Sequence, residues 1–176
     1  MTDQITTTIA VVQQLVLSLT FILIPIAAQK YGQRAQDAAE KVVADQGFKE
    51  GLLLKNGVKM TESKVEMLLP LAFALAYLAV AVIGISGGHF NDVLLWIVES
   101  FTLLIVGMVT AQQVFVAAFL NRAFKKSKDA SLRKINVEAF VTAASKVLPV
   151  WVRPLQVIRF LAASAGSIVV IILLCI

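Results

Sequence analysis

The sequence predicts an all-α, polytopic membrane protein: a four-helix transmembrane bundle that forms one domain over residues 1–176. Three values favour this class. Of the residues, 59% are hydrophobic and only 15% are charged, and the mean hydropathy is +0.84. A soluble domain of this size needs a polar shell, and a disordered chain needs low hydrophobicity with high net charge. The composition therefore excludes both of these classes.

The expected membrane spans are the long apolar runs. A transmembrane helix needs about 20 mostly apolar residues to cross the hydrocarbon core of a bilayer. Four stretches meet this requirement, at about residues 9–28, 67–85, 93–113 and 157–176. The first has no basic segment ahead of it and leads directly into a charged helical segment, so we interpret it as a retained helix and not as a signal peptide.

The basic residues predict the orientation of these spans. All sixteen Lys and Arg residues lie between 30 and 64 or between 122 and 159. Because basic loops stay on the cytoplasmic side, we expect loops 30–66 and 121–156 to be cytoplasmic and both termini to lie outside. Tyr31 and Trp151 near the inner ends of spans and Trp96 near an outer end suit this placement. The predicted location is a plasma membrane, as in the bacterial inner membrane.

The first cytoplasmic loop is predicted to begin as a helix. Residues 29–46 are rich in Ala, Gln, Glu and Lys, so we expect span 1 to continue through them and to end at Gly47 as a C-cap. The stretch 47–57 carries three glycines and indicates a turn or short hairpin closed at Asn56-Gly57. Alternatively, leucines 52–54 dip into the membrane surface. Thr61 or Ser63 is expected to cap the next helix.

The second cytoplasmic loop carries most of the excess positive charge. Apolar residues recur at helical spacing over 131–148, which predicts an amphipathic interfacial helix between spans 3 and 4. A patch for anionic lipid or for a partner is expected at Arg122, Lys125, Lys126, Lys128, Arg133 and Lys134. The alternative is ordinary positive charge that only fixes the topology. Both loops are short, so we expect partners to complete their burial. Arg159, just inside span 4, is expected to reach back to the interface.

Two polar stripes run along spans 1 and 3. At 100° per residue, Glu99 shares one face with the span 3 residues Thr102, Thr110 and Gln113. In helix 1, a seven-residue spacing relates Thr6, Gln13 and Thr20. The stripes indicate either a polar path through the bundle or ordinary hydrogen bonds between helices. Under the second interpretation, Tyr77 lies at a suitable depth to bond Glu99.

The residue types needed for catalysis or for metal binding are scarce. The single histidine, His89, falls in the expected outer turn 86–92, and the single cysteine, Cys175, is next to the last residue. Neither a zinc-binding cluster nor a paired-histidine haem site is possible within one chain. Nucleotide-binding and hydrolase motifs are missing too. We therefore expect no enzyme activity, no cofactor and no nucleic-acid partner.

Two functions remain open at the level of sequence. The first is a structural or anchoring subunit of a membrane assembly, which suits the small-residue helix faces and the lack of catalytic groups. The alternative is a homo-oligomeric ion or proton channel, or a permeabilising, holin-like protein, with a polar path along helices 1 and 3. The partners expected are the bilayer itself, anionic lipid at its cytoplasmic face, and either further copies of the chain or a larger membrane complex.

Overall fold

The computed structural model describes residues 2–61, 63, 65–86 and 92–176, and within these ranges every regular element is a helix. Four helices are long and apolar enough to cross a membrane. They are Gln4–Asp45, Leu68–Ile85, Val93–Val114 and Val152–Leu173. The prediction of an all-α chain with four such helices is confirmed. Most of the expected outer turn 86–92, including His89, lies outside the described residues.

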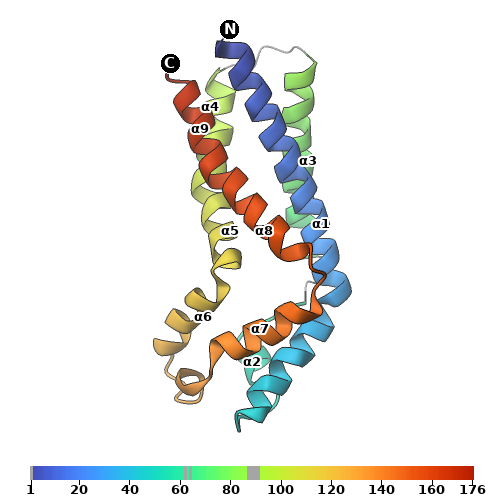
Figure 1. Cartoon of the computed structure of the whole chain (residues 1–176), viewed down its shortest axis with the longest axis vertical. Helices are drawn as coiled ribbons and strands as arrows, with labels where there is room; N and C mark the ends of the chain where they lie inside the picture. The colour runs from blue at the N-terminus through green and yellow to red at the C-terminus, as the bar shows by residue number, and fades with distance from the viewer. Residues whose placement is uncertain (1, 62, 64, 87–91) are drawn as a thin grey trace.

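Helix α1 (Thr2–Asp45) is the longest element and passes unbroken through Pro25. Its end has the glycine geometry expected from the sequence, because Gly47 has a φ of +86°. The N–H of Phe48 then donates to the carbonyl of Val43, at 3.3 Å. This bond satisfies a carbonyl at the helix end that has no partner within the helix. Helix α1 is therefore continuous. In Figure 1 it extends from the upper layer of helices into the lower one.

The other three long helices form the upper layer with the first half of α1 (Figure 1). One is α3 (Leu68–Ile85), which packs along α1. Each of the remaining two is divided by a π-helical turn. The first comprises α4 (Asp92–Phe101), the turn Thr102–Val106 and α5 (Gly107–Val114), and the second comprises α8 (Val152–Leu161), the turn Ala162–Gly166 and α9 (Ser167–Leu173). The α8–α9 helix contacts both α1 and the α4–α5 helix, and the two π turns touch each other.

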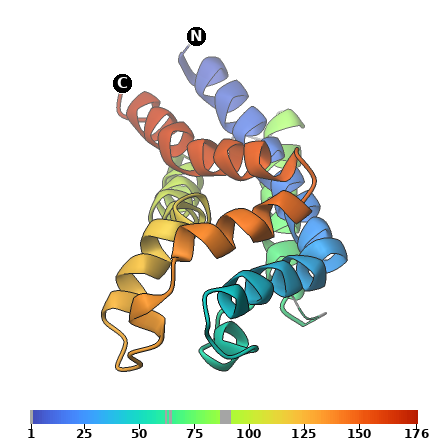
Figure 2. The same cartoon turned by 60° about the horizontal axis from the view of Figure 1, so that its bottom comes forward.

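The lower layer is a second packed unit, which we call the platform. It consists of α1 beyond Gln29, α2 (Leu52–Lys55), α6 (Val116–Lys125) and α7 (Val137–Val147). Figure 2 shows α7 between α6 and the lower half of α1, and both contacts are made. The buried side chains of its core are Ala35, Ala39, Val43, Leu53, Phe124, Leu132, Ile135, Val137, Phe140 and Ala144. The expectation that these loops need partners to bury their apolar residues is therefore wrong, because the loops bury them against one another.

Helix α7 corrects the prediction of an interfacial helix over 131–148. The helix forms over Val137–Val147, and the Asn136 side chain caps it by accepting from the N–H of Ala139. Its apolar face, however, is covered by the platform core, with Phe140 0% exposed. That face is occupied by protein and is not free to lie in a membrane surface.

The glycine-rich stretch is also a helix and not a hairpin. Leu52–Lys55 forms a single helical turn between Gly51 and Gly57, which have φ values of +74° and +78°. Within it, Leu53 is fully buried in the platform core, whereas Leu54 is half exposed. The three leucines therefore do not act together as a membrane-dipping segment.

Between α2 and α3 the chain crosses the surface of α1, and it contacts α1 at two residues, Gln36 and Gly32. The buried amide of Gln36 accepts from the N–H of Met60 at 2.8 Å and donates to the carbonyl of Val58 at 3.3 Å. One turn away, a Cβ atom added to Gly32 would lie 2.5 Å from the carbonyl oxygen of Met60. The chain segment around Met60 can lie this close to α1 only because residue 32 has no side chain.

We expect Gly32→Ala to destabilise the protein by about 1–3 kcal/mol, because the new methyl group meets backbone and forces it aside. The sign of the effect is informative. Gly→Ala inside a freely exposed helix stabilises it by about 1 kcal/mol. Thermal unfolding in detergent compares Gly32→Ala with the wild type. Gln33→Ala, on the exposed face of the same helix, is the matched control. A Gly32→Ala protein more stable than the wild type would contradict the close crossing.

A capping box precedes α3. The Ser63 hydroxyl accepts from the N–H of Glu66, and the Glu66 carboxylate accepts from the N–H of Ser63 and pairs with Lys59 at 3.0 Å. The expected cap of α3 by Thr61 or Ser63 is wrong, however, because α3 begins at Leu68 with Met67 as its N-cap and no side-chain cap hydrogen bond, and Ser63 bonds only Glu66 ahead of it. The contacts of the Glu66 carboxylate, first of all the backbone N–H of Ser63, lower the pKa of Glu66 from 4.5 to about 2.

The depressed pKa of Glu66 predicts a pH-dependent contribution to stability. A group with a lower pKa in the folded state stabilises it above its ordinary pKa and loses this effect as the pH falls through the folded value. The stability difference between the wild type and Glu66→Gln should therefore be constant above about pH 4.5 and vanish toward about pH 2. Thermal unfolding from pH 6 to pH 2.5 measures it. A difference that stays constant over the whole range would contradict the prediction.

Candidate functional site

The most polar point inside the upper layer is the carboxylate of Glu99 on α4. Its side chain is 0% exposed. The amide nitrogen of Gln13 donates to Glu99 Oε2 at 2.8 Å, and that of Gln14 donates to Glu99 Oε1 at 2.6 Å. Both glutamines lie on α1, so the carboxylate joins α1 to α4. We call Gln13, Gln14, Glu99 and Ser167 the Glu99 cluster.

Gln13 extends this cluster to the last helix of the chain. Its amide nitrogen lies 2.9 Å from the hydroxyl of Ser167 and 3.1 Å from the carbonyl oxygen of Ala162. Ala162 begins a π turn, in which the wider turn displaces the carbonyls from their usual i+4 partners. A Cβ added to Gly166 would lie 3.2 Å from Gln13 Cδ, so the glycine leaves room for the amide. Three long helices therefore meet at one glutamine.

The hydrogen bonding of the cluster is incomplete on one side. Both glutamines are buried, yet neither Gln13 Oε1 nor Gln14 Oε1 has a hydrogen-bond partner in the described structure. A buried amide oxygen without a partner costs free energy. The cluster therefore carries two acceptors that are free to receive a hydrogen bond.

Of the other polar residues predicted on helix 3, Thr102 and Thr110 are buried, whereas Gln113 is exposed. Thr102 lies 2.9 Å from the hydroxyl of Tyr77 and bonds the carbonyl of Val98. Thr110 bonds the carbonyl of Val106 within its own helix. The expected hydrogen bond between Tyr77 and Glu99 is therefore replaced by one to Thr102, three residues further along.

The helix 1 stripe also faces the interior. Thr6, Gln13 and Thr20 are each at most 6% exposed. Of these, Gln13 bonds Glu99 directly, whereas Thr20 bonds the carbonyl of Leu17 on its own helix. The two predicted stripes thus meet through side chains at the level of Gln13 and Glu99.

Arg159 on α8 is buried, in contrast to its expected position at an interface. It is 3% exposed and donates through Nη2 to Gln113 Oε1 on α5. Its guanidinium carbon lies 5.0 Å from the centre of the Phe21 ring, in cation–π geometry. The side chain joins α8 to α5 and α1, so it stays inside the protein instead of reaching out.

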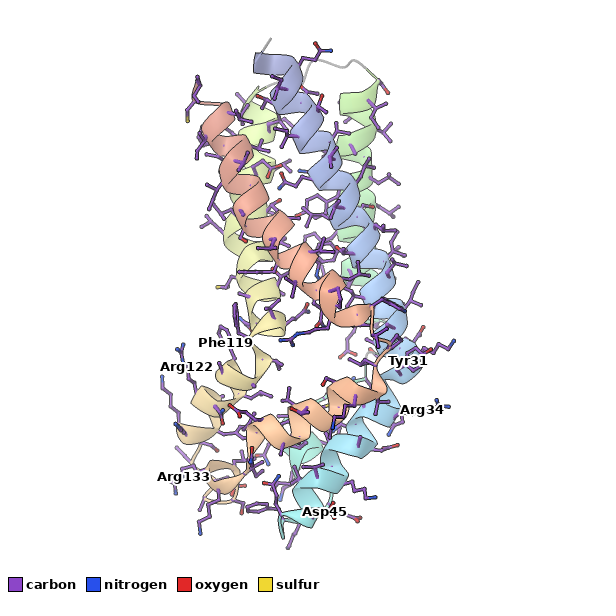
Figure 3. All side chains as sticks on the ribbon, in the orientation of Figure 1. Tyr31, Arg34, Asp45, Phe119, Arg122 and Arg133 are labelled. Atoms are coloured by element: carbon purple, nitrogen blue, oxygen red, sulfur yellow. The ribbon has the colours of Figure 1, made fainter. Side chains whose placement is uncertain are left out.

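The six basic residues of the predicted patch are all exposed, and they do not lie at one level. Figure 3 shows Arg122 just below Phe119, near the junction between the two layers, and Arg133 much further down the platform. Among the described residues, no group of three His, Cys, Asp or Glu side chains is placed to hold a metal ion. The structure therefore separates a buried polar cluster in the upper layer from basic residues spread over the lower one.

Gln14, Ser167 and Arg159 are the residues of this interior that the sequence reasoning missed as partners. The adjacent amides Gln13 and Gln14 in an apolar run were the available signal. Comparison with protein-family models, with curated proteins and with solved structures finds no match. Fold and site together define a class: an all-helical protein in which three of four long apolar helices meet at a buried carboxylate.

Proposed function

We propose that the protein is a structural or anchoring subunit of a membrane assembly. In this proposal the upper layer lies in the bilayer and the platform lies on the cytoplasmic side. The observation that carries it is the continuity of α1, which runs as one helix of 44 residues from the upper layer into the core of the platform. A membrane anchor needs such a rigid connection between its embedded and its exposed parts.

The distribution of charge supports this orientation. Apart from Arg159, the described Lys and Arg residues lie outside the apolar runs 9–28, 67–85, 93–113 and 157–176, at Lys30 to Lys59 and Arg122 to Arg153. Both chain termini lie at the opposite end of the molecule (Figure 1). Because basic segments are retained in the cytoplasm, the platform faces inward and the termini face outward.

The bonding inside the upper layer also supports a structural role. Glu99, Gln13 and Arg159 each bond a residue on a different helix. Contacts of this kind hold helices together in a membrane, where the hydrophobic effect no longer does so. Four of the residues predicted for a path, Gln13, Glu99, Thr102 and Gln113, thus bond a neighbouring helix.

The size of the intact complex tests the proposal. The tagged protein is extracted from its own membranes into polymer-bounded lipid discs, and the mass of the particles is measured. An anchoring subunit gives particles that contain a second protein in fixed ratio. Particles made only of further copies of this chain would support a homo-oligomeric pore instead.

A proton or ion path is the second candidate, and a specific observation favours it. The Glu99 carboxylate is fully buried beside two amide oxygens that have no hydrogen-bond partner. Ionisable residues inside membrane helices often mark transport pathways. In the anchoring proposal the Glu99 carboxylate only bonds other helices, whereas in the transport proposal it binds the proton or ion that crosses the membrane.

Proton flux into liposomes separates the two proposals. If Glu99 is structural, purified wild-type protein and Glu99→Gln should both give the flux of protein-free liposomes, measured with an enclosed pH-sensitive dye and valinomycin. The amide retains the shape of the side chain and removes its ionisation. Wild-type flux above that of empty liposomes, abolished in a Glu99→Gln protein that still folds, would establish transport instead.

A further inference from the structure

The basic residues at the far end of α6 form a compact surface. Five cationic side chains lie within the ten residues 125–134, and all of them are exposed. They are Lys125, Lys126, Lys128, Arg133 and Lys134. We call this segment the basic corner.

The basic corner is a built turn and not a loose tail. The Ser127 hydroxyl accepts from the N–H of Asp129 at 3.1 Å, and Asp129 Oδ1 accepts from the N–H of Ser131 at 2.8 Å. Leu132 and Ile135, which follow directly, are buried in the platform core. Because the backbone is held on both sides, the cations are presented in a fixed arrangement, which lowers the entropy cost of binding.

The position of the corner sets it apart from charge that only fixes topology. Figure 3 shows Tyr31 and Phe119 at about the same height, with Arg34 and Arg122 just below them. Aromatic residues followed by basic ones are typical of a membrane boundary. In the same view, Arg133 lies most of the way down toward Asp45 at the end of α1.

The distance from this boundary exceeds the reach of lipid charge. Helix α1 continues for about 21 Å from Tyr31 to Asp45 at 1.5 Å per residue. The attraction of anionic headgroups falls off within a Debye length, about 8 Å at physiological ionic strength. A cation array most of the way down this length lies beyond that attraction, so an anion that binds it comes from a molecule other than the bilayer lipid.

We infer that the basic corner docks an acidic segment of a partner protein. This inference rests on the proposed anchoring function and names the chemistry of the partner. Carboxylates on such a segment bond the Arg133 guanidinium in a planar, two-point arrangement and pair with the surrounding lysines. The corner holds one acid, Asp129, which accepts from the backbone N–H of Ser131, and its five cations leave it strongly positive.

Binding of a defined acidic probe tests the inference. A fluorescent ten-residue poly-glutamate peptide is titrated against the full-length protein in zwitterionic lipid discs. Neutralising three corner cations (Lys125→Gln, Lys128→Gln and Arg133→Gln) should weaken binding about tenfold, since each exposed ion pair contributes a little and three are lost together. The matched control neutralises three exposed lysines elsewhere on the platform (Lys41→Gln, Lys49→Gln and Lys55→Gln) and should change affinity less than about twofold. Equal effects of the two triple variants would overturn the inference.

A depth measurement excludes the lipid alternative. Spin labels at Arg122→Cys and Arg133→Cys, in a Cys175→Ser background, are compared for their relative exposure to oxygen and to a water-soluble nickel complex in anionic lipid discs. We expect residue 122 at headgroup depth and residue 133 in water. If residue 133 also lies at headgroup depth, the corner binds anionic lipid and the inference is overturned. A native complex whose mass survives corner neutralisation would overturn this inference and leave the anchoring function standing.

Discussion

Phe140→Ala should lower the free energy of unfolding of the platform by about 3–5 kcal/mol, the usual cost of truncating a fully buried phenylalanine. Phe140 is 0% exposed and is the largest fully buried side chain of the protein's described residues. It lies in the core shared by α1, α2, α6 and α7, and its ring is 6.3 Å from that of Phe124. Its removal therefore leaves a cavity where four elements meet.

Hydrogen exchange locates the effect of Phe140→Ala. Amides of residues 137–147 and 35–45 should lose protection, while those of residues 93–113 keep it, because the upper layer has its own buried clusters. Thr142→Ala, on the exposed face of the same helix, is the control and should cost less than about 0.5 kcal/mol. A Phe140→Ala protein with unchanged protection over residues 35–45 would show that the platform core does not bind α7 to α1.

This core also shows where sequence reasoning reached its limit. The helical periodicity of residues 131–148 predicted a helix with an apolar face, and α7 has that face. Periodicity states that a face must be covered and does not state by what. The covering element, the lower half of α1, lies about a hundred residues earlier in the chain, and no local pattern relates the two.

The polar interior could be predicted only in part, again because the prediction depends on a local pattern. The 100° rule placed Glu99, Thr102 and Thr110 on one face, and all three are buried. The wheel assumes an unbroken α-helix, whereas a π turn over Thr102–Val106 adds a residue to that turn and rotates the face below it. Beyond this turn Thr110 is still buried and bonds its own helix, whereas Gln113, predicted on the same face, is exposed.

Gln14 falls outside the seven-residue repeat that predicts the polar stripe of helix 1. That repeat selects Gln13 and leaves Gln14 about 100° away. Both amides nonetheless reach the two oxygens of one carboxylate, because a bidentate acceptor lying between two adjacent side chains can engage both. An adjacent amide pair in an apolar helix is thus a better indicator of a buried acid than a stripe.

Replacing both glutamines (Gln13→Leu with Gln14→Leu) should destabilise the upper layer by about 2–6 kcal/mol, because two buried carboxyl oxygens each lose their donor at a cost of about 1–3 kcal/mol. This exceeds the sum of the two lost bonds, each about 0.6 kcal/mol on average in a membrane. The excess arises because the Glu99 carboxylate stays buried while both of its amide donors are gone. Unfolding in bicelles, followed by denaturant or by steric trapping, measures the difference.

A third substitution separates the stranded carboxylate from altered packing. Adding Glu99→Leu to the double variant removes the group that lost its partners, and a wholly apolar core of similar volume is often as stable as the polar one. We therefore expect the triple variant to recover most of the lost stability. Thr110→Val, which removes a bond within one helix, is the control and should cost less than about 1 kcal/mol. A triple variant no more stable than the double would mean that the glutamines act through their shape, and the carboxylate would then not be what holds α1 to α4.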